Sequence, residues 1–293
     1  MKKFTSFIYG IVLLTISFSF TGCDQSTVGT SGGGSGTSAP GKKISQVYYW
    51  NSVISSKSDD DGDTWTTTDY TVGERQLNEE WYWNGDKISR IHVNSDEKGV
   101  KHGTYYFEFN NNDLVSKITN HESDIEYCFT YSGNKISQLD SYKGDDHQRS
   151  KYYYTGNKLT KMVITDDKKS GSSIVEFKWT GNNITWAKAT IYGIFVEYFE
   201  LSYDNKYNPY YGNNSLTAWT FSALSLGCYS YNNCTHAVMT GIDDEEEIIT
   251  MIYDSDNYPI TIEETEYDKS YKGNILVRET EFRHYDLYYL DED

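Results

Sequence analysis

The chain has 293 residues, a formal net charge of −17 at pH 7 and a mean hydropathy of −0.67. A surface this acidic repels nucleic acid and anionic lipid headgroups, which argues against both as partners. The length left after the N-terminal segments, about 250 residues, suits one large β domain or two small ones.

The first segment is typical of exported proteins. Two lysines precede the mostly apolar residues 8–20, a run too short to span a bilayer core, which takes ~20 apolar residues. A charged start, a short apolar stretch and small residues predict a signal peptide over residues 1–22. The four residues Phe20-Thr21-Gly22-Cys23 resemble the lipobox of bacterial lipoproteins, with phenylalanine where leucine is usual.

That resemblance implies cleavage before Cys23 and lipidation of this residue. Several acyl chains anchor a protein stably where one would not. The protein is therefore expected in the bacterial cell envelope, on the surface or the periplasmic face of the outer membrane, with the lipid anchor as its only contact with the membrane. The alternatives are an ordinary secretory signal followed by an unmodified cysteine, or an uncleaved membrane helix.

A glycine- and serine-rich stretch follows the cysteine and includes Ser-Gly-Gly-Gly-Ser-Gly-Thr-Ser-Ala-Pro. Such a sequence buries too little apolar surface to fold, so residues 23–43 are predicted to form a flexible tether. The folded part is expected to begin at Ile44 and to form a single domain over residues 44–293.

The composition of the folded part favours β-strands. The chain holds 28 tyrosines, 7 tryptophans and 12 phenylalanines, against 3 prolines. Aromatic residues are enriched in strands, and runs of helix-forming residues with a 3.6-residue period are absent. The low mean hydropathy fits a sheet with one face in water, because half of its positions are then polar.

A short phrase recurs along this region: an aromatic residue, a polar residue, Gly or Asn, Asn or Asp, a polar residue, then Ile or Leu. The aromatic residues of the five clear copies are 26, 22, 23 and 25 residues apart. A period of this length indicates one supersecondary unit per repeat. The clear copies begin at Trp83, Phe109, Tyr131, Tyr154 and Trp179, and looser ones at Tyr203, Tyr253 and Tyr271.

Each copy is interpreted as a β-hairpin. Gly-Asn and Gly-Asp tolerate positive φ, as tight hairpin turns require, and the alternating aromatics before the turn lie on one face of a strand. After the turn come an apolar residue, two polar residues and a second apolar residue, as in Ile136-Ser-Gln-Leu139. This spacing breaks the strict alternation of inward and outward residues. Ile136 is therefore interpreted as an apolar residue that fills the turn, and Leu139 as the first residue of the alternating strand.

About eight such hairpins give roughly sixteen strands, and open twisted sheets of more than ~10 strands tend to curl or split. The predicted fold is all-β: an antiparallel meander of repeated β-hairpins that forms a curled or rolled sheet, with its aromatic face inside. A two-sheet sandwich is the alternative. A propeller is disfavoured, because it needs a period of ~40–45 residues.

The repeat resembles the YD/RHS type, in which Tyr-Asp or Tyr-x-x-Gly-Asn precedes leucine. More closely, the chain is similar to a family of Bacteroidetes lipoproteins built of such hairpins, above all in residues 203–212, 231–233 and 253–259. These stretches begin Tyr-Asp-Asn, Tyr-Asn-Asn and Tyr-Asp-Ser. The resemblance covers residues 44–270 and implies a β-hairpin array in the cell envelope. It implies no activity.

No motif for catalysis or cofactor binding stands out. The six histidines have no metal-ligand spacing, and a nucleophile elbow, a phosphate loop and a dinucleotide fingerprint are all absent. The acidic run Asp59–Asp63 offers four carboxylates to calcium, but its glycine comes too early and no glutamate ends the loop. This run and Asp243–Glu247 are interpreted as solvated loops. The sequence thus predicts a protein that is not an enzyme and holds no metal or cofactor.

Two of the remaining cysteines are close in sequence. Cys228 and Cys234 flank five residues and could close a small loop in an oxidising envelope, since a hairpin would bring their Cα atoms within the ~7 Å that a disulfide needs. Two separate buried thiols are the alternative. Cys128 lies in an aromatic strand and is expected to pack there.

Clustered aromatic residues are the one positive sign of binding. Tyrosine and tryptophan give rigid, flat contact surfaces of the kind on which sugars stack. The longest gap between clear repeats holds one cluster, and interruptions of a repeat array often carry function. The candidate ligand-binding residues are Tyr207, Tyr210, Tyr211 and Trp219, with packing of these rings in the core as the alternative.

Two functions are open on this basis. A non-catalytic surface module that binds a glycan or a protein would show an exposed aromatic patch at the cluster. A structural component of an envelope assembly would instead dock through an exposed apolar sheet edge.

Overall fold

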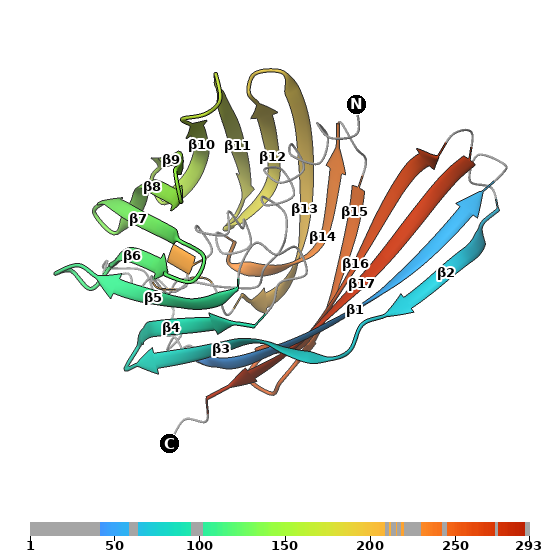
Figure 1. Cartoon of the computed structure of the whole chain (residues 1–293), viewed down its shortest axis with the longest axis horizontal. Helices are drawn as coiled ribbons and strands as arrows, with labels where there is room; N and C mark the ends of the chain where they lie inside the picture. Colours follow the sequence, from blue (N-terminus) through green and yellow to red (C-terminus); the bar gives the residue numbers. More distant parts are fainter. Residues whose placement is uncertain are drawn as a thin grey trace.

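The computed structural model describes residues 42–58, 64–94, 102–208, 211, 215, 218–219, 230–241, 245–272 and 275–290. Almost all of them lie in seventeen β-strands (Figure 1). No helix in this part of the chain is long and apolar enough to cross a membrane. The expected signal peptide, Cys23 and nearly all of the tether lie outside the described residues. The strands are β1 Ile44–Ser58, β2 Thr66–Val72, β3 Gln76–Asn84, β4 Lys87–Val93, β5 Gly103–Phe109, β6 Val115–Asn120, β7 Ile125–Ser132, β8 Lys135–Lys143, β9 Asp146–Thr155, β10 Lys158–Asp166, β11 Ser172–Thr180, β12 Asn183–Ile191, β13 Phe195–Tyr207, β14 Asn232–Thr240, β15 Glu245–Tyr253, β16 Pro259–Lys272 and β17 Ile275–Tyr289.

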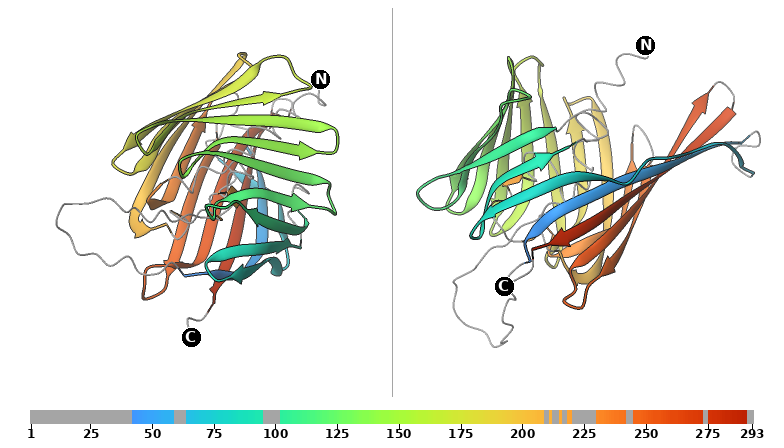
Figure 2. Two further views of the ribbon diagram at one scale, coloured as in Figure 1. Left: turned by 90° about the vertical axis from the view of Figure 1, so that its left-hand side faces the viewer. Right: turned by 60° about the horizontal axis from the view of Figure 1, so that its bottom comes forward.

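The strands form one antiparallel sheet that closes on itself. β1 pairs with β17 along its whole length, from Ile44 opposite Tyr289 to Ser58 opposite Leu276. On its other side β1 pairs with β3 near its start and with β2 near its end, so β2 and β3 share one place in the ring. The result is a barrel of sixteen strand positions, seen from three directions in Figure 1 and Figure 2.

The predicted all-β antiparallel meander is therefore confirmed, but its predicted shape is wrong. A rolled sheet and a sandwich both leave two edges unpaired. Here the last strand returns to the first, so the sheet closes into a barrel.

A β-bulge in each hairpin explains the three-residue apolar spacing. In the hairpin of β7 and β8, Tyr131 pairs with Ile136 and Thr130 pairs with Gln138, which leaves Ser137 unpaired. The extra residue brings Ile136 and Leu139 to the same face, and both are buried. Ile136 is thus the buried residue next to the turn that the sequence predicts. The corresponding unpaired residues of the other clear repeats are Ser89, Ser116, Thr160 and Thr185.

The aromatic residue of the repeat joins one hairpin to the one before it. Its ring is half-buried, and its N–H or O–H donates a hydrogen bond to a backbone carbonyl of the preceding unit at 2.7 to 2.9 Å. This satisfies the polar atom of a ring that packs against the core. The bonds run from Trp83 to Ile44, from Tyr131 to Val115, from Tyr154 to Ile136 and from Trp179 to Leu159.

One contact across the barrel shows which face of the sheet is the inside. Trp219 lies on the connection between β13 and β14, and its ring packs against Tyr105 and Phe107 of β5, with centroids 4.9 and 6.2 Å away. β5 and β13 are half-way round the ring from each other. In Figure 1 the short orange segment near β6 and β7 lies within the ring of strands. The face that carries Tyr105 and Phe107 therefore points inward.

The inward face is apolar and the outward face is polar. Buried side chains from β1 to β17 form one connected hydrophobic cluster. The positions that alternate with them carry a charged residue on every strand from β3 to β13. These outward charged residues are Glu80, Arg90, Glu108, Lys117, Glu126, Asp140, Arg149, Lys151, Lys161, Glu176, Lys178, Lys188 and Glu200.

The inward face of β15 to β17 is an exception, because it holds a buried ionic cluster. Nη1 of Arg283 lies 3.9 Å from Glu247 and 4.0 Å from Glu264, and its Nη2 contacts Glu266 and Glu281. Glu264 is 1% exposed. Burial of Arg283 disfavours its charged form, but the surrounding glutamates outweigh this effect and raise the pKa of the guanidinium.

The chain enters the barrel beside the tight turns. Nζ of Lys42 lies 2.7 Å from both Asp254 and Asp256, in the turn between β15 and β16, and Nζ of Lys43 lies 2.8 Å from Asp86 in the turn between β3 and β4. These two lysines, at the end of the predicted tether, are thus fixed to the barrel.

Candidate functional site

The predicted aromatic cluster does not form one exposed patch. Trp219 is 1% exposed and packs in the core, so the platform expected at this residue is absent and packing is the better interpretation. Tyr211 is exposed, and its ring meets that of Tyr231 edge-on at 5.4 Å. Tyr207 is the last residue of β13, and its side chain is not among the described ones. The whole of Tyr210 lies outside the described residues. A ligand-binding role for Tyr207, Tyr210 and Tyr211 stays a prediction.

The two described cysteines, Cys128 and Cys234, carry thiols whose pKa is raised by burial. Cys234 is a free buried thiol whose Sγ donates to the carbonyl of His236, and burial raises its pKa. Cys228 lies outside the described residues, so a disulfide between Cys228 and Cys234 stays a prediction. Cys128 is a free thiol on β7, and burial, with a hydrogen bond to Glu126, raises its pKa to about 11. A thiol with so high a pKa is a poor nucleophile at neutral pH.

The acidic runs give no metal site in the described part of the chain. Residues 59–63 lie outside it, as do Asp243 and Asp244. The remaining residues of the second run begin β15, and Glu247 is buried beside Arg283, so the interpretation of this run as a solvated loop is wrong for Glu247. No group of three His, Cys, Asp or Glu side chains among the described residues could hold a metal ion.

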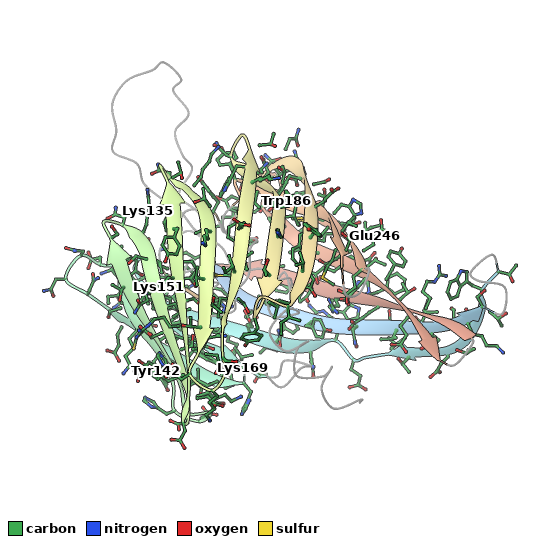
Figure 3. All side chains as sticks on the ribbon, turned by 90° about the horizontal axis from the view of Figure 1, so that it is seen from above. Lys135, Tyr142, Lys151, Lys169, Trp186 and Glu246 are labelled. Atoms are coloured by element: carbon green, nitrogen blue, oxygen red, sulfur yellow. The ribbon has the colours of Figure 1, made fainter. Side chains whose placement is uncertain are left out.

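Cross-strand register brings a different set of side chains together on the outer wall of β9 to β13. One cross-strand row runs over these five strands, and each of its residues is opposite the next. In order from β9 to β13 it contains Tyr153, Lys161, Glu176, Lys188 and Tyr198. Figure 3, which looks onto this wall, labels Lys151 and Trp186 on it. We call this set the lysine–aromatic platform: Lys151, Tyr153, Lys161, Glu176, Lys178, Trp186, Lys188, Tyr198 and Glu200.

Two rings form the centre of the platform. Trp186 and Tyr198 lie on neighbouring strands with their centroids 6.1 Å apart and their planes tilted by 44°. Nζ of Lys178 lies 3.9 Å from the centroid of Trp186, and Nζ of Lys188 lies 6.0 Å from that of Tyr198. Tyr198 is 41% exposed and Trp186 is half-buried, so the pair offers water an apolar surface bordered by ammonium groups.

The platform offers groups for binding. Its carboxylates Glu176 and Glu200 are exposed beside the lysines and the two rings. Aromatic faces, ammonium donors and carboxylate acceptors on a rigid sheet are the groups that recognise sugar rings and their hydroxyls. Sequence reasoning missed this site because its members are single outward residues on five strands, and only the register makes them neighbours.

A second cluster on the outer wall is a structural clasp. Nε2 of His147, on β9, lies 2.9 Å from Asp140 of β8, and its Nδ1 lies 2.8 Å from Asp167. The imidazole ring stacks on the ring of Tyr142, with the two centroids 4.6 Å apart. Arg149 donates to the same Asp140 at 2.7 Å. Both imidazole nitrogens face carboxylates, so the charged form is favoured and the pKa of His147 is raised by its bonds to Asp140 and Asp167.

This clasp predicts a pH-dependent contribution to stability. A histidine whose pKa is raised on folding stabilises the fold fully below its unfolded pKa of about 6.5, and the contribution disappears as pH rises through the higher folded value. We expect His147→Gln to cost about 1 kcal/mol of unfolding free energy at pH 5.5 and less at pH 9. Urea denaturation at both pH values measures the difference, with His121→Gln as a control outside the clasp. An equal cost at both pH values would contradict the clasp.

Comparison with known proteins gives likenesses of fold. No family model matches the chain, and no curated protein matches it. A porin-like protein from Bacteroides uniformis is similar in structure, with a TM-score of 0.52 and 11% sequence identity over 85% of this chain and 99% of that chain. A porin-like protein from Bacteroides vulgatus gives a TM-score of 0.46 at 12% identity over 86% of this chain and 100% of that chain. An outer membrane channel from Pseudomonas putida gives a TM-score of 0.23 at 8% identity over 88% of this chain and 100% of that chain. At these identities the first likeness supports the barrel fold and nothing more.

Proposed function

We propose that this protein is a lipid-anchored, non-catalytic barrel of the cell envelope that stands in water and binds a glycan on its lysine–aromatic platform. The observation that carries the proposal is the outward pair of half-buried Trp186 and exposed Tyr198, with the lysines beside it. Rigid aromatic rings on a sheet present contact area at little cost in conformational entropy.

The distribution of polarity supports a barrel outside the bilayer. A membrane-spanning barrel alternates apolar residues toward lipid with polar residues toward its lumen, and its outer apolar band is ~25 Å tall. In this protein the alternation is reversed, with charges outside and a hydrophobic cluster inside. An arginine or lysine facing lipid at mid-membrane costs ~2–4 kcal/mol, and the outer wall of β9 to β12 carries five such residues. An aqueous channel would also need a polar lining, which the apolar interior does not give.

The place where the chain enters the barrel supports anchorage at one end. Lys42 and Lys43 are fixed beside the tight turns, so a tether from Cys23 leaves the barrel there. The platform lies on the side wall of the barrel, on β9 to β13. A glycan would thus reach it from the aqueous phase beside the membrane.

Loss of either platform ring should weaken glycan binding without unfolding the barrel. We expect some member of a panel of neutral and acidic polysaccharides to raise the thermal unfolding midpoint of the full chain, since a ligand specific to the native state stabilises it. Trp186→Ala and Tyr198→Ala should each weaken binding about tenfold or more and leave the midpoint without ligand nearly unchanged.

Tyr82→Ala is the matched control for Tyr198→Ala. Tyr82 lies on the outer wall of β3, is 37% exposed and has Arg90 over its ring at 4.0 Å. This variant should bind as the wild type does. A panel in which no polysaccharide shifts the midpoint, or binding that survives Trp186→Ala, would contradict the proposal.

A second candidate function is docking in an envelope assembly, and β2 favours it. This strand pairs with β1, and no pairing on its other side occurs among the described strands. Every residue of β2 is exposed, Tyr70 and Val72 most of all. An open edge of this kind can accept a strand from a partner. Cross-linking in intact cells through a photoreactive residue at position 70 tests it: capture of a partner protein there supports docking, and its absence counts against it.

A further inference from the structure

Resting on the proposed function, we infer that the glycan is acidic: a polysaccharide with negatively charged groups on its sugar rings. Lys151, Lys161, Lys178 and Lys188 would bind these groups, and Trp186 and Tyr198 would stack on the rings. The inference goes beyond glycan binding in general, because it assigns the ligand a charge and gives each lysine a partner.

The platform lysines lack the partners that most other described lysines have. Most lysines whose side chains the structure describes pair with a carboxylate or donate to a carbonyl or amide oxygen. Lys42, Lys43, Lys87, Lys117, Lys168 and Lys169 form ion pairs, and Lys135, Lys158 and Lys206 form hydrogen bonds.

Six described lysines have neither kind of bond, and four of them stand together on the platform. The six are Lys57, Lys143, Lys151, Lys161, Lys178 and Lys188. Glu176 is opposite both Lys161 and Lys188 in the register, but no ion pair within 4.0 Å forms between them in the described structure. Ammonium groups held in water next to aromatic rings are available to an anionic ligand.

The charge of the platform contrasts with that of the rest of the molecule. The chain carries a net charge of −17, which repels polyanions in general. The platform, in contrast, holds four lysines and two glutamates, and Arg149, which is also on the outer wall of β9, pairs with Asp140 of β8. A local positive surface on an acidic protein selects a polyanion that also fits the aromatic rings.

The spacing of the lysines suits an extended ligand. Lys161 and Lys188 lie in one cross-strand row on β10 and β12, two strands apart, so their backbones are separated by about 10 Å. Lys151 lies in the row on one side of them, opposite Val163, and Lys178 in the row on the other side, opposite Trp186. An extended polysaccharide that runs across the strands along the row of Lys161 and Lys188 would meet an ammonium group at every second strand and have a further one on either side. Glu176 and Glu200 between them would accept hydrogen bonds from sugar hydroxyls.

The test compares polygalacturonate with its fully methyl-esterified form, which has the same sugar without the charge. The full chain is purified in a polyoxyethylene detergent, which contains no sugar, and affinities are measured by biolayer interferometry at two salt concentrations. Polygalacturonate should bind at least about tenfold more tightly than the ester, and the difference should shrink at high salt.

Paired lysine variants locate the contact. Lys161→Gln with Lys188→Gln should weaken binding of polygalacturonate about fivefold or more and leave binding of the ester unchanged. The matched control, Lys57→Gln with Lys143→Gln, removes the same charge from lysines that also lack partners but lie off the platform. The control should bind as the wild type does.

Three other results would each contradict a different part of the proposal. Equal affinity for polygalacturonate and its ester, lost in Trp186→Ala, would refute the acidic ligand and leave glycan binding intact. Absence of binding to any polysaccharide of the panel would refute both. Equal binding of a DNA oligonucleotide would show attraction to any polyanion and would refute recognition of a sugar.

Discussion

Replacing Trp219 with alanine is expected to lower the unfolding free energy by about 3–5 kcal/mol, the range for a large buried aromatic side chain. Its ring fills space between the β13–β14 connection and β5, where it contacts Tyr105 and Phe107. Truncation leaves a cavity that the opposite wall of a closed barrel cannot fill by moving inward, because each strand is held by its neighbours.

The control is Trp186→Ala, which removes the same side chain from the outer wall. It should cost about 1 kcal/mol or less, because its ring is half-exposed and no cavity forms. Guanidinium denaturation with tryptophan fluorescence measures both variants. Equal costs for the two would mean that Trp219 is not part of the core, and a glycan-binding role for it would be open again.

Replacing Arg283 with methionine is expected to cost about 3–5 kcal/mol, because it leaves buried carboxylates without their positive partner. Glu247, Glu264, Glu266 and Glu281 all lie within ion-pair distance of this one guanidinium. Methionine keeps most of the volume of the side chain but removes its charge together with its N–H donors.

Two variants sharpen this result. Arg90→Met removes an arginine from the outer wall, where it lies over the ring of Tyr82, and should cost about 1 kcal/mol or less. Arg283→Met combined with Glu264→Gln should recover part of the loss, since one buried negative charge is removed as well. If the double variant is no more stable than Arg283→Met, repulsion among the glutamates is not the cause.

Much of the fold follows from local sequence signals. The glycine-centred turns and the recurrent aromatic residue predict hairpins, and their number predicts about sixteen strands. The apolar spacing of Ile136 and Leu139 predicts a buried residue next to the turn, which the bulge at Ser137 explains. These features are local because a hairpin is formed by residues close in sequence.

Closure of the barrel could not be predicted in the same way. It depends on the pairing of β1 with β17, more than two hundred residues apart, and no local pattern specifies that pairing. The charged cluster around Arg283 is equally non-local, because its glutamates come from β15, β16 and β17. In the sequence these residues look like the solvated acids that are common throughout the chain.

The candidate site differed from the prediction for a related reason. Residues 207–231 do interrupt the array of hairpins, between the end of β13 and the start of β14, but Trp219 is buried in the interior. The rings of the platform belong to ordinary repeats, where Trp186 and Tyr198 occupy outward positions on two neighbouring strands. Composition alone cannot separate an inward ring from an outward one when a bulge shifts the alternation.

The central claim is that the barrel stands in water, and one experiment tests it most directly. The chain without residues 1–22 and with Cys23→Ser, which cannot be lipidated, is produced in detergent-free buffer and then added to a planar lipid bilayer. We expect a monomeric, cooperatively unfolding protein that stays in solution and gives no ion conductance, since its outer wall is charged. A protein that dissolves only in detergent and opens stepwise conductances in the bilayer would contradict the claim and show that the barrel is a membrane channel.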